Sequence, residues 1–135
     1  MASIIRKVIL TPKAVAPLGP YSQAVLVDKT LYIAGQIGIN PESGTLVSGG
    51  VENEAKQSFT ALSAICDAAG ASLNNVVKTT IYLQDMQDWP KVNQIYETFF
   101  KVPYPARTAI QVAALPKGAL VEVEAVAVIG DIKDQ

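Results

Sequence analysis

Apolar and polar residues follow two different periods along this chain, and these periods predict both strands and helices. In six stretches, apolar residues alternate with polar ones or form short runs between turn signals, which is typical of strands. The predicted strands cover residues 4–10, 25–27, 31–34, 76–83, 107–114 and 120–128. Two other stretches carry apolar residues at helical spacing, so we expect strands and helices to alternate.

The first predicted helix covers residues 51–69. Its apolar stripe consists of Val51, Ala55, Phe59, Leu62, Ile65, Cys66 and Ala69. Glu52 and Glu54 lie in the first turn, where the helix dipole favours acids, and Gly70 suits the C-terminal cap. We expect this helix to pack on a sheet and to carry no chemistry.

The second predicted helix begins near Asp88, a candidate N-cap, and tolerates Pro90 in its first turn. Apolar side chains follow at helical spacing: Val92, Ile95, Tyr96, Phe99 and Phe100. Asn93 lies at the edge of this stripe, a position where asparagine is usually solvated.

The predicted order is three strands, a helix, a strand, a helix and two strands, which indicates an α+β fold with helices layered on a sheet. The chain has 135 residues, enough for one domain with a real core, and we expect a single domain over residues 1–135. Half of the residues are apolar and only 17% are charged, which excludes a disordered chain.

The last two predicted strands surround a Leu-Pro-Lys-Gly turn at 115–118 and carry unusual charges. Arg107 opens the first strand on one face with Ala109. In the second strand, Glu122 and Glu124 share a face that is otherwise apolar. A charge among valines is costly unless it is paired or solvated. The pattern alone is equally compatible with a functional site and with an ordinary exposed sheet face.

Composition narrows the chemistry. The net charge is -1, so no general basic field attracts nucleic acid, although a local basic patch stays open. The chain has no histidine, and no residue spacing suggests a metal site, so we expect neither metal nor cofactor.

Cys66 is the only cysteine and is expected to be a small buried hydrophobe. No apolar run is long enough to span a bilayer. A reducing compartment fits, and we expect the cytoplasm, with mitochondrial or nuclear pools left open.

Several motifs closely resemble those of one family. They are PAR at 105–107, QVAALPKG at 111–118, VEVEAVA at 121–127, GPYSQA at 19–24 and AGQI at 34–37. Together they resemble the RidA (YjgF) family of reactive-intermediate deaminases, which hydrolyse 2-imino acids, and most of all its animal members. The resemblance extends from about Ile5 to Ile129.

The resemblance implies a chorismate-mutase-like fold, a mixed sheet packed against two helices, and a homotrimer with clefts between subunits. It implies a small imino acid substrate such as 2-iminobutanoate, 2-iminopropanoate or 2-aminoacrylate. Arg107 would anchor the substrate carboxylate by a planar two-point hydrogen bond. Glu122 would orient or activate water and return a proton to nitrogen. Tyr21 would offer its hydroxyl, and the substrate would also be bound by Gly35, Asn93 and Ala109.

The chain departs from many bacterial members at two positions, because Ala34 replaces a common serine and Ala109 a common cysteine. A mechanism that needs a hydroxyl or thiol there is therefore in doubt. Gly35 also suits a simple strand end or a bulge.

Two other functions stay open: a single-strand RNA endonuclease that inhibits translation, and a holdase-like or ligand-sensing trimer without turnover. RNA cleavage is the less expected, because it usually needs histidines or metal ions. A basic groove for RNA would have to come from Lys56, Lys78, Lys101, Lys117 and Arg107.

Overall fold

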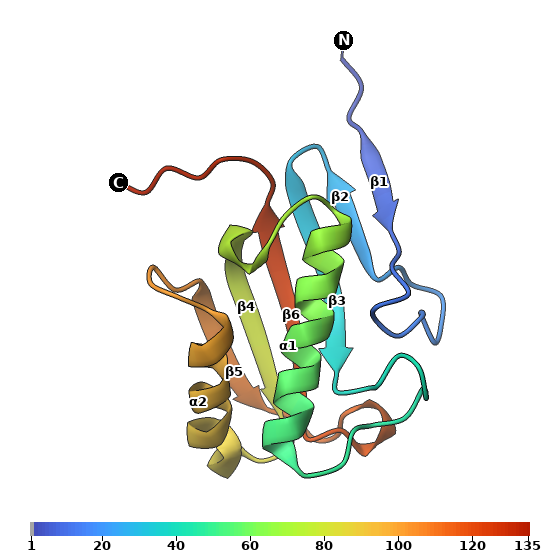
Figure 1. The fold of residues 1–135 in the computed structure, drawn as a ribbon, viewed down its shortest axis with the longest axis vertical. Coiled ribbons are helices and arrows are strands. Elements are labelled where there is room, and N and C mark those ends of the chain that lie inside the picture. The colour runs from blue at the N-terminus through green and yellow to red at the C-terminus, as the bar shows by residue number, and fades with distance from the viewer. Residues whose placement is uncertain (1) are drawn as a thin grey trace.

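The strands pair into one six-stranded sheet, and both helices cover the same face of it (Figure 1). This arrangement is that of a computed structural model, which describes residues 2–135. The strands are β1 (Arg6–Ile9), β2 (Ala24–Val27), β3 (Thr30–Ile37), β4 (Val76–Leu83), β5 (Ala106–Gln111) and β6 (Val121–Val128). The helices are α1 (Val51–Ala68) and α2 (Trp89–Phe99). The predicted order of elements and the α+β class are confirmed.

The strand order in the sheet is β1-β2-β3-β6-β4-β5. All neighbours are antiparallel except β4 and β5, which are parallel. Although β5 and β6 follow each other along the chain, β4 lies between them. β5 also ends at Gln111, before the predicted end at residue 114, because β4 ends at Leu83 and offers its last carbonyl to the amide of Val112 at 2.9 Å.

Alternation along β6 separates the two faces of the sheet. Val121, Val123, Ala125 and Ala127 are buried on the face covered by the helices, whereas Glu122, Glu124, Val126 and Val128 are half-buried on the other face. The predicted division of this strand is therefore confirmed. The uncovered face is partly apolar, since Tyr32 is 54% and Ile110 42% exposed.

α1 ends as predicted, because Gly70 adopts the left-handed conformation with φ 83° and Ala71 donates back to the carbonyl of Cys66 at 2.9 Å. The apolar stripe of α1 is buried on the sheet. Glu54 is buried with it, at 6% exposure, and accepts a hydrogen bond from the amide of Leu120 at 2.8 Å. This first-turn acid therefore ties α1 to the residue that precedes β6, and burial raises its pKa.

Within residues 2–135, no helix is both long and apolar enough to cross a membrane.

Candidate active site

One group of predicted site residues gathers around a small cavity where β6 begins. The cavity has a volume of about 50 Å³, and its lining includes Leu18, Tyr21, Gly35, Pro116 and Glu122. Such a space holds a few water molecules. The structure therefore brings Tyr21, Gly35 and Glu122 together, from the loop before β2, from β3 and from β6.

Glu122 is half-buried in this cavity, and its pKa is raised. Burial is the main cause, because desolvation disfavours the charged carboxylate, and the negative charge of Glu124 adds to it. A raised pKa is the property that lets a carboxyl group both accept and return a proton near neutral pH.

Gly35 makes room for the Glu122 carboxylate. The β3–β6 register shifts between Ile33 and Gln36, so Gly35 lies in a bulge, which was one of its predicted roles. A Cβ atom at Gly35 would come within 2.7 Å of both Cδ and Oε2 of Glu122. A larger residue here would therefore displace the carboxylate.

Tyr21 is 50% exposed, and its hydroxyl accepts a hydrogen bond from the amide of Leu18 at 3.1 Å. The loop that precedes it is held by Gln23, which is only 1% exposed. The Gln23 amide accepts from the Thr11 amide at 2.8 Å and donates to the carbonyls of Thr11 at 3.1 Å and Val15 at 3.0 Å. The sequence analysis missed this role of Gln23, although a polar residue at the start of an apolar strand could have indicated it.

Glu124 is paired rather than free. Tyr82 donates its hydroxyl to Oε1 of Glu124, and this bond is the main reason that the pKa of Tyr82 is raised to about 12. This contact makes Glu124 a paired strand residue rather than a free acid.

A second group forms around Arg107 on β5, at the edge of the sheet. Its Nη2 donates to Oδ1 of Asn93 on α2 at 2.7 Å. The guanidinium lies over the ring of Tyr96 at 4.7 Å and near the ring of Trp89 at 5.8 Å. Asn93 is thus a partner of Arg107 rather than a merely solvated residue. Ala109 lies on the same face of β5 and is half-buried.

The two groups do not meet within one chain. Arg107 faces the helices, because it contacts α2, whereas Glu122 faces away from them. β4 also separates their strands in the sheet. Alternation within single strands does not predict this separation, because it carries no information about which strands pair. One described chain therefore carries the two groups on opposite faces of its sheet.

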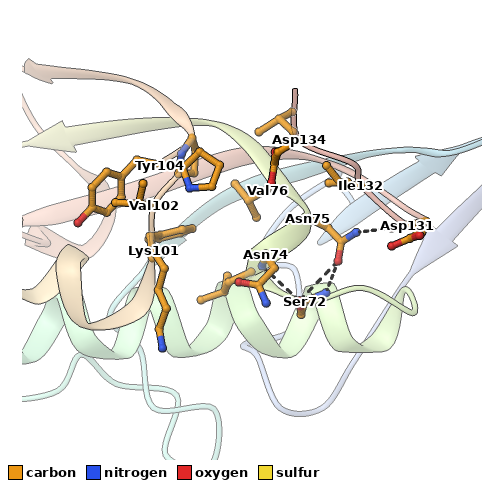
Figure 2. A pocket seen from close by; sticks show the side chains of 16 residues that line it. Ser72, Asn74, Asn75, Val76, Lys101, Val102, Tyr104, Asp131, Ile132 and Asp134 are labelled. Carbon is orange, nitrogen blue, oxygen red and sulfur yellow. Dashed lines mark hydrogen bonds between the residues drawn. The ribbon is translucent and has the colours of Figure 1, made fainter.

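A larger cavity lies elsewhere (Figure 2). It has a volume of about 650 Å³ and is lined by residues 72–77 and 100–105 and by Gly130, Asp131, Ile132 and Asp134 of the C-terminal segment. Asn75 in its lining is bonded within the chain, since it donates to the carbonyls of Val128 at 2.9 Å and Gly130 at 3.0 Å. No predicted catalytic or substrate-binding residue lines it.

The lysines considered for an RNA groove are spread apart. Lys101 lines the large cavity, Lys78 lies on the uncovered sheet face, and Lys56 lines a groove between α1 and residues 40–48. These three lysines therefore do not form one basic groove.

Cys66 is fully buried as predicted, and burial raises the pKa of its thiol to about 11. Among the described residues, no cluster of three or more cysteine, aspartate or glutamate side chains is arranged to hold a metal ion.

A family model, curated relatives and solved structures all match most of this chain. The family model described as Endoribonuclease L-PSP matches residues 11–129. A mouse protein named 2-iminobutanoate/2-iminopropanoate deaminase is 61% identical over 130 residues, which is 96% of this chain and 96% of the relative. The crystal structure of RidA from an Antarctic Psychrobacter species matches with a TM-score of 0.89 at 48% identity, covering 91% of this chain and 99% of that one. E. coli TdcF, solved with bound serine, matches with a TM-score of 0.88 at 35% identity, covering 92% and 99%.

Proposed function

This chain belongs to the RidA family, and we propose that it hydrolyses 2-imino acids such as 2-iminobutanoate and 2-iminopropanoate to 2-keto acids and ammonia. Its curated relatives with 55–61% identity over nearly their full length are named 2-iminobutanoate/2-iminopropanoate deaminases. The observation that carries the proposal is that one chain holds both a fixed guanidinium and a half-buried carboxyl group of raised pKa.

Arg107 anchors the substrate in this proposal. Asn93 occupies one position of its Nη2, and the guanidinium has further N–H donors in the same plane. A planar guanidinium matches a carboxylate in geometry as well as in charge, which a lysine does not. The imino carbon beside the bound carboxylate would then be held in a defined place.

Glu122 does the proton transfer. As water adds to the C=N carbon, the Glu122 carboxylate takes a proton from the water and passes it to the imine nitrogen, which gives a carbinolamine. Glu122 then takes the proton of the new hydroxyl group and passes it to the amino nitrogen as the C–N bond breaks and the carbonyl forms, so one water is consumed and one ammonia is released. Tyr21 contributes its hydroxyl to the substrate or water, and Gly35 and Ala109 contribute backbone groups. This route needs no side-chain hydroxyl or thiol at Ala34 or Ala109.

We further propose that the complete site lies between subunits of a homotrimer, with the Arg107 half from one copy and the Glu122 half from another. The position of the two halves on opposite faces of one sheet supports this proposal. β5 is an edge strand, so a second copy has access to the Arg107 half. The uncovered sheet face, with Tyr32, Ile110 and Val126, offers apolar surface for assembly.

The direct test uses a dehydratase that generates 2-aminoacrylate in the presence of this protein. We expect pyruvate and ammonia to form well above the spontaneous rate, by a species with three times the chain mass in light scattering. The same preparation is incubated with single-stranded RNA, because the family description names an endoribonuclease. RNA cleavage without imine hydrolysis would contradict the proposal, and an active monomer would contradict the shared site.

A further inference from the structure

The Tyr96 ring, over which the Arg107 guanidinium lies, is buried among aromatic side chains of both helices. Tyr96 is 4% exposed and lies 4.7 Å from the guanidinium carbon, measured to the ring centroid. Phe100 stacks on Tyr96 with centroids 4.3 Å apart and an angle of 23° between planes. Phe59 from α1 meets it edge to face at 5.6 Å and 82°. These neighbours leave the ring little freedom to tilt.

The hydroxyl of Tyr96 is also fixed. It shares a hydrogen bond of 2.9 Å with Oγ1 of Thr79, which is fully buried on β4. Thr79 is the residue opposite Arg107 in the β4–β5 register. Thr79 therefore contacts both parts of this arrangement: it pairs with Arg107 between β4 and β5, and it hydrogen-bonds to the ring that packs against the guanidinium.

We propose that Tyr96 is a positioning residue for the substrate carboxylate, acting through Arg107, and this inference rests on the function proposed above. The guanidinium lies over the Tyr96 ring and Nη2 donates to Asn93, so both contacts hold the remaining donors in one orientation. The side-chain freedom that a flexible arginine would lose on binding is then already lost in the folded protein.

A tyrosine that only fills the core would be buried in the same way. The test must therefore change the charge of the ring face at position 96 and leave the shape of the ring almost unchanged. The attraction between a cation and an aromatic face comes from the negative charge of the π face, and fluorine substituents withdraw that charge with little change of shape. Replacing Tyr96 by phenylalanine and then by its 4-fluoro, 3,5-difluoro and 3,4,5-trifluoro forms gives a graded series. Tyr96→Phe also removes the Thr79 bond while keeping the ring.

Pyruvate is the probe, and its Kd is measured by titration calorimetry on the assembled protein. We expect Tyr96→Phe to stay within about threefold of wild type, and the trifluoro form to bind roughly 3- to 30-fold more weakly than Tyr96→Phe. The unfolding temperature should change little along the series, and the loss in imine hydrolysis should lie in KM more than in kcat. A Kd that stays constant, or tightens because the ring merely neutralises Arg107, would overturn the proposal.

Nuclear magnetic resonance provides a readout that does not depend on turnover. Ring current from Tyr96 should move the Arg107 Nε–H proton upfield in wild type, and this contribution should be lost in Tyr96→Leu, whereas Thr79→Val should retain most of the shift. An absent shift in wild type would overturn the contact itself. If Arg107→Ala still binds pyruvate, Arg107 is not the anchor of the proposed function, and the positioning role of Tyr96 is refuted with it. If Arg107→Ala loses pyruvate binding but the Kd stays constant along the fluorine series, the anchor stands and only the positioning role is refuted.

Discussion

The surroundings of Arg107 and Glu122 are built in different ways. Arg107 is held by side-chain partners, because its Nη2 donates to Asn93 and its guanidinium lies over the Tyr96 ring. Glu122 is placed by the absence of a side chain at Gly35 and is shielded from water, with the charge of Glu124 nearby. Arg107 is therefore fixed in position by its neighbours, whereas the surroundings of Glu122 raise the pKa of its carboxyl group.

The comparison is tested most strongly at Glu122. Glu122→Gln keeps the size of the side chain but removes its basicity, so turnover of 2-iminopropanoate should fall by roughly 10²–10⁴-fold. The acidic limb of the pH profile of kcat/KM should also disappear, because the wild-type limb reports a carboxyl group whose pKa lies above the ordinary value of 4.5. Steady-state kinetics from acid to neutral pH measure both effects. Near-normal turnover would reduce Glu122 to a structural strand residue.

Arg107→Ala should cause the next largest loss. Removing one partner of a desolvated charge pair typically costs about 2–5 kcal/mol, which is roughly 30- to several-thousand-fold in kcat/KM. Arg107→Lys should recover only part, because a lysine supplies a point charge rather than a planar fork. Pyruvate should raise the unfolding temperature of wild type and not that of Arg107→Ala. Equal protection of both proteins would show that Arg107 does not bind the carboxylate.

Gly35→Ala should lower turnover less than either of these changes and should affect only the position of Glu122. The added methyl group would meet the Glu122 carboxylate at 2.7 Å, so the flexible acid side chain must move. A displacement of this size is expected to lower kcat by about 10- to 100-fold while pyruvate still binds. Gly19→Ala is the matched control, because its new Cβ would lie at an ordinary 3.6 Å from the Tyr21 ring. Equal kcat values for the two variants would argue against the close approach.

Glu54 provides the smallest test, since it is a buried acid outside the cavity. Its pKa is raised in the folded protein, so the folded state holds the proton more tightly and stability falls as pH rises from about 4.5 through the folded pKa. Glu54→Gln removes the buried charge and keeps an oxygen for the Leu120 amide. It should therefore unfold a few degrees higher than wild type at neutral pH and converge with it below pH 4.5.

Glu52→Gln, in the same turn but exposed, is the control for Glu54 and should show no such gain. Calorimetry across this pH range measures the effect, and a gain for Glu54→Gln that persists unchanged in acid would contradict the buried charge as its cause.

Much of the fold follows from local sequence patterns. The stripe from Val51 to Ala69, the cap at Gly70 and the alternation of residues 121–128 each depend on neighbours in sequence, and the structure confirms them. The resemblance indicated the candidate residues, and the structure adds that Asn93 contacts Arg107 and that Gly35 contacts Glu122.

The sequence patterns do not predict where Arg107 and Glu122 lie relative to each other in the sheet. The position of β4 between β5 and β6 depends on strand pairing over long distances along the chain, and alternation within one strand carries no information about it. The contacts of Glu54 with Leu120 and of Tyr96 with Arg107 also join different elements of the fold. The helical pattern alone therefore identifies Glu54 only as a first-turn acid and Tyr96 only as a core aromatic residue.

The claim that the site is shared between copies is tested most directly by mixing two inactive variants, Arg107→Ala and Glu122→Gln, under conditions that allow subunits to exchange. If one copy supplies the arginine and its neighbour the glutamate, some mixed interfaces combine an intact Arg107 with an intact Glu122. An equal mixture should then recover about a quarter of the wild-type activity, because half of the copies and half of their neighbours carry the intact residue. If both residues acted from the same chain, every site would keep one defect. A mixture that exchanges subunits, shown by mass spectrometry of the mixed trimers, and yet stays inactive would contradict the account.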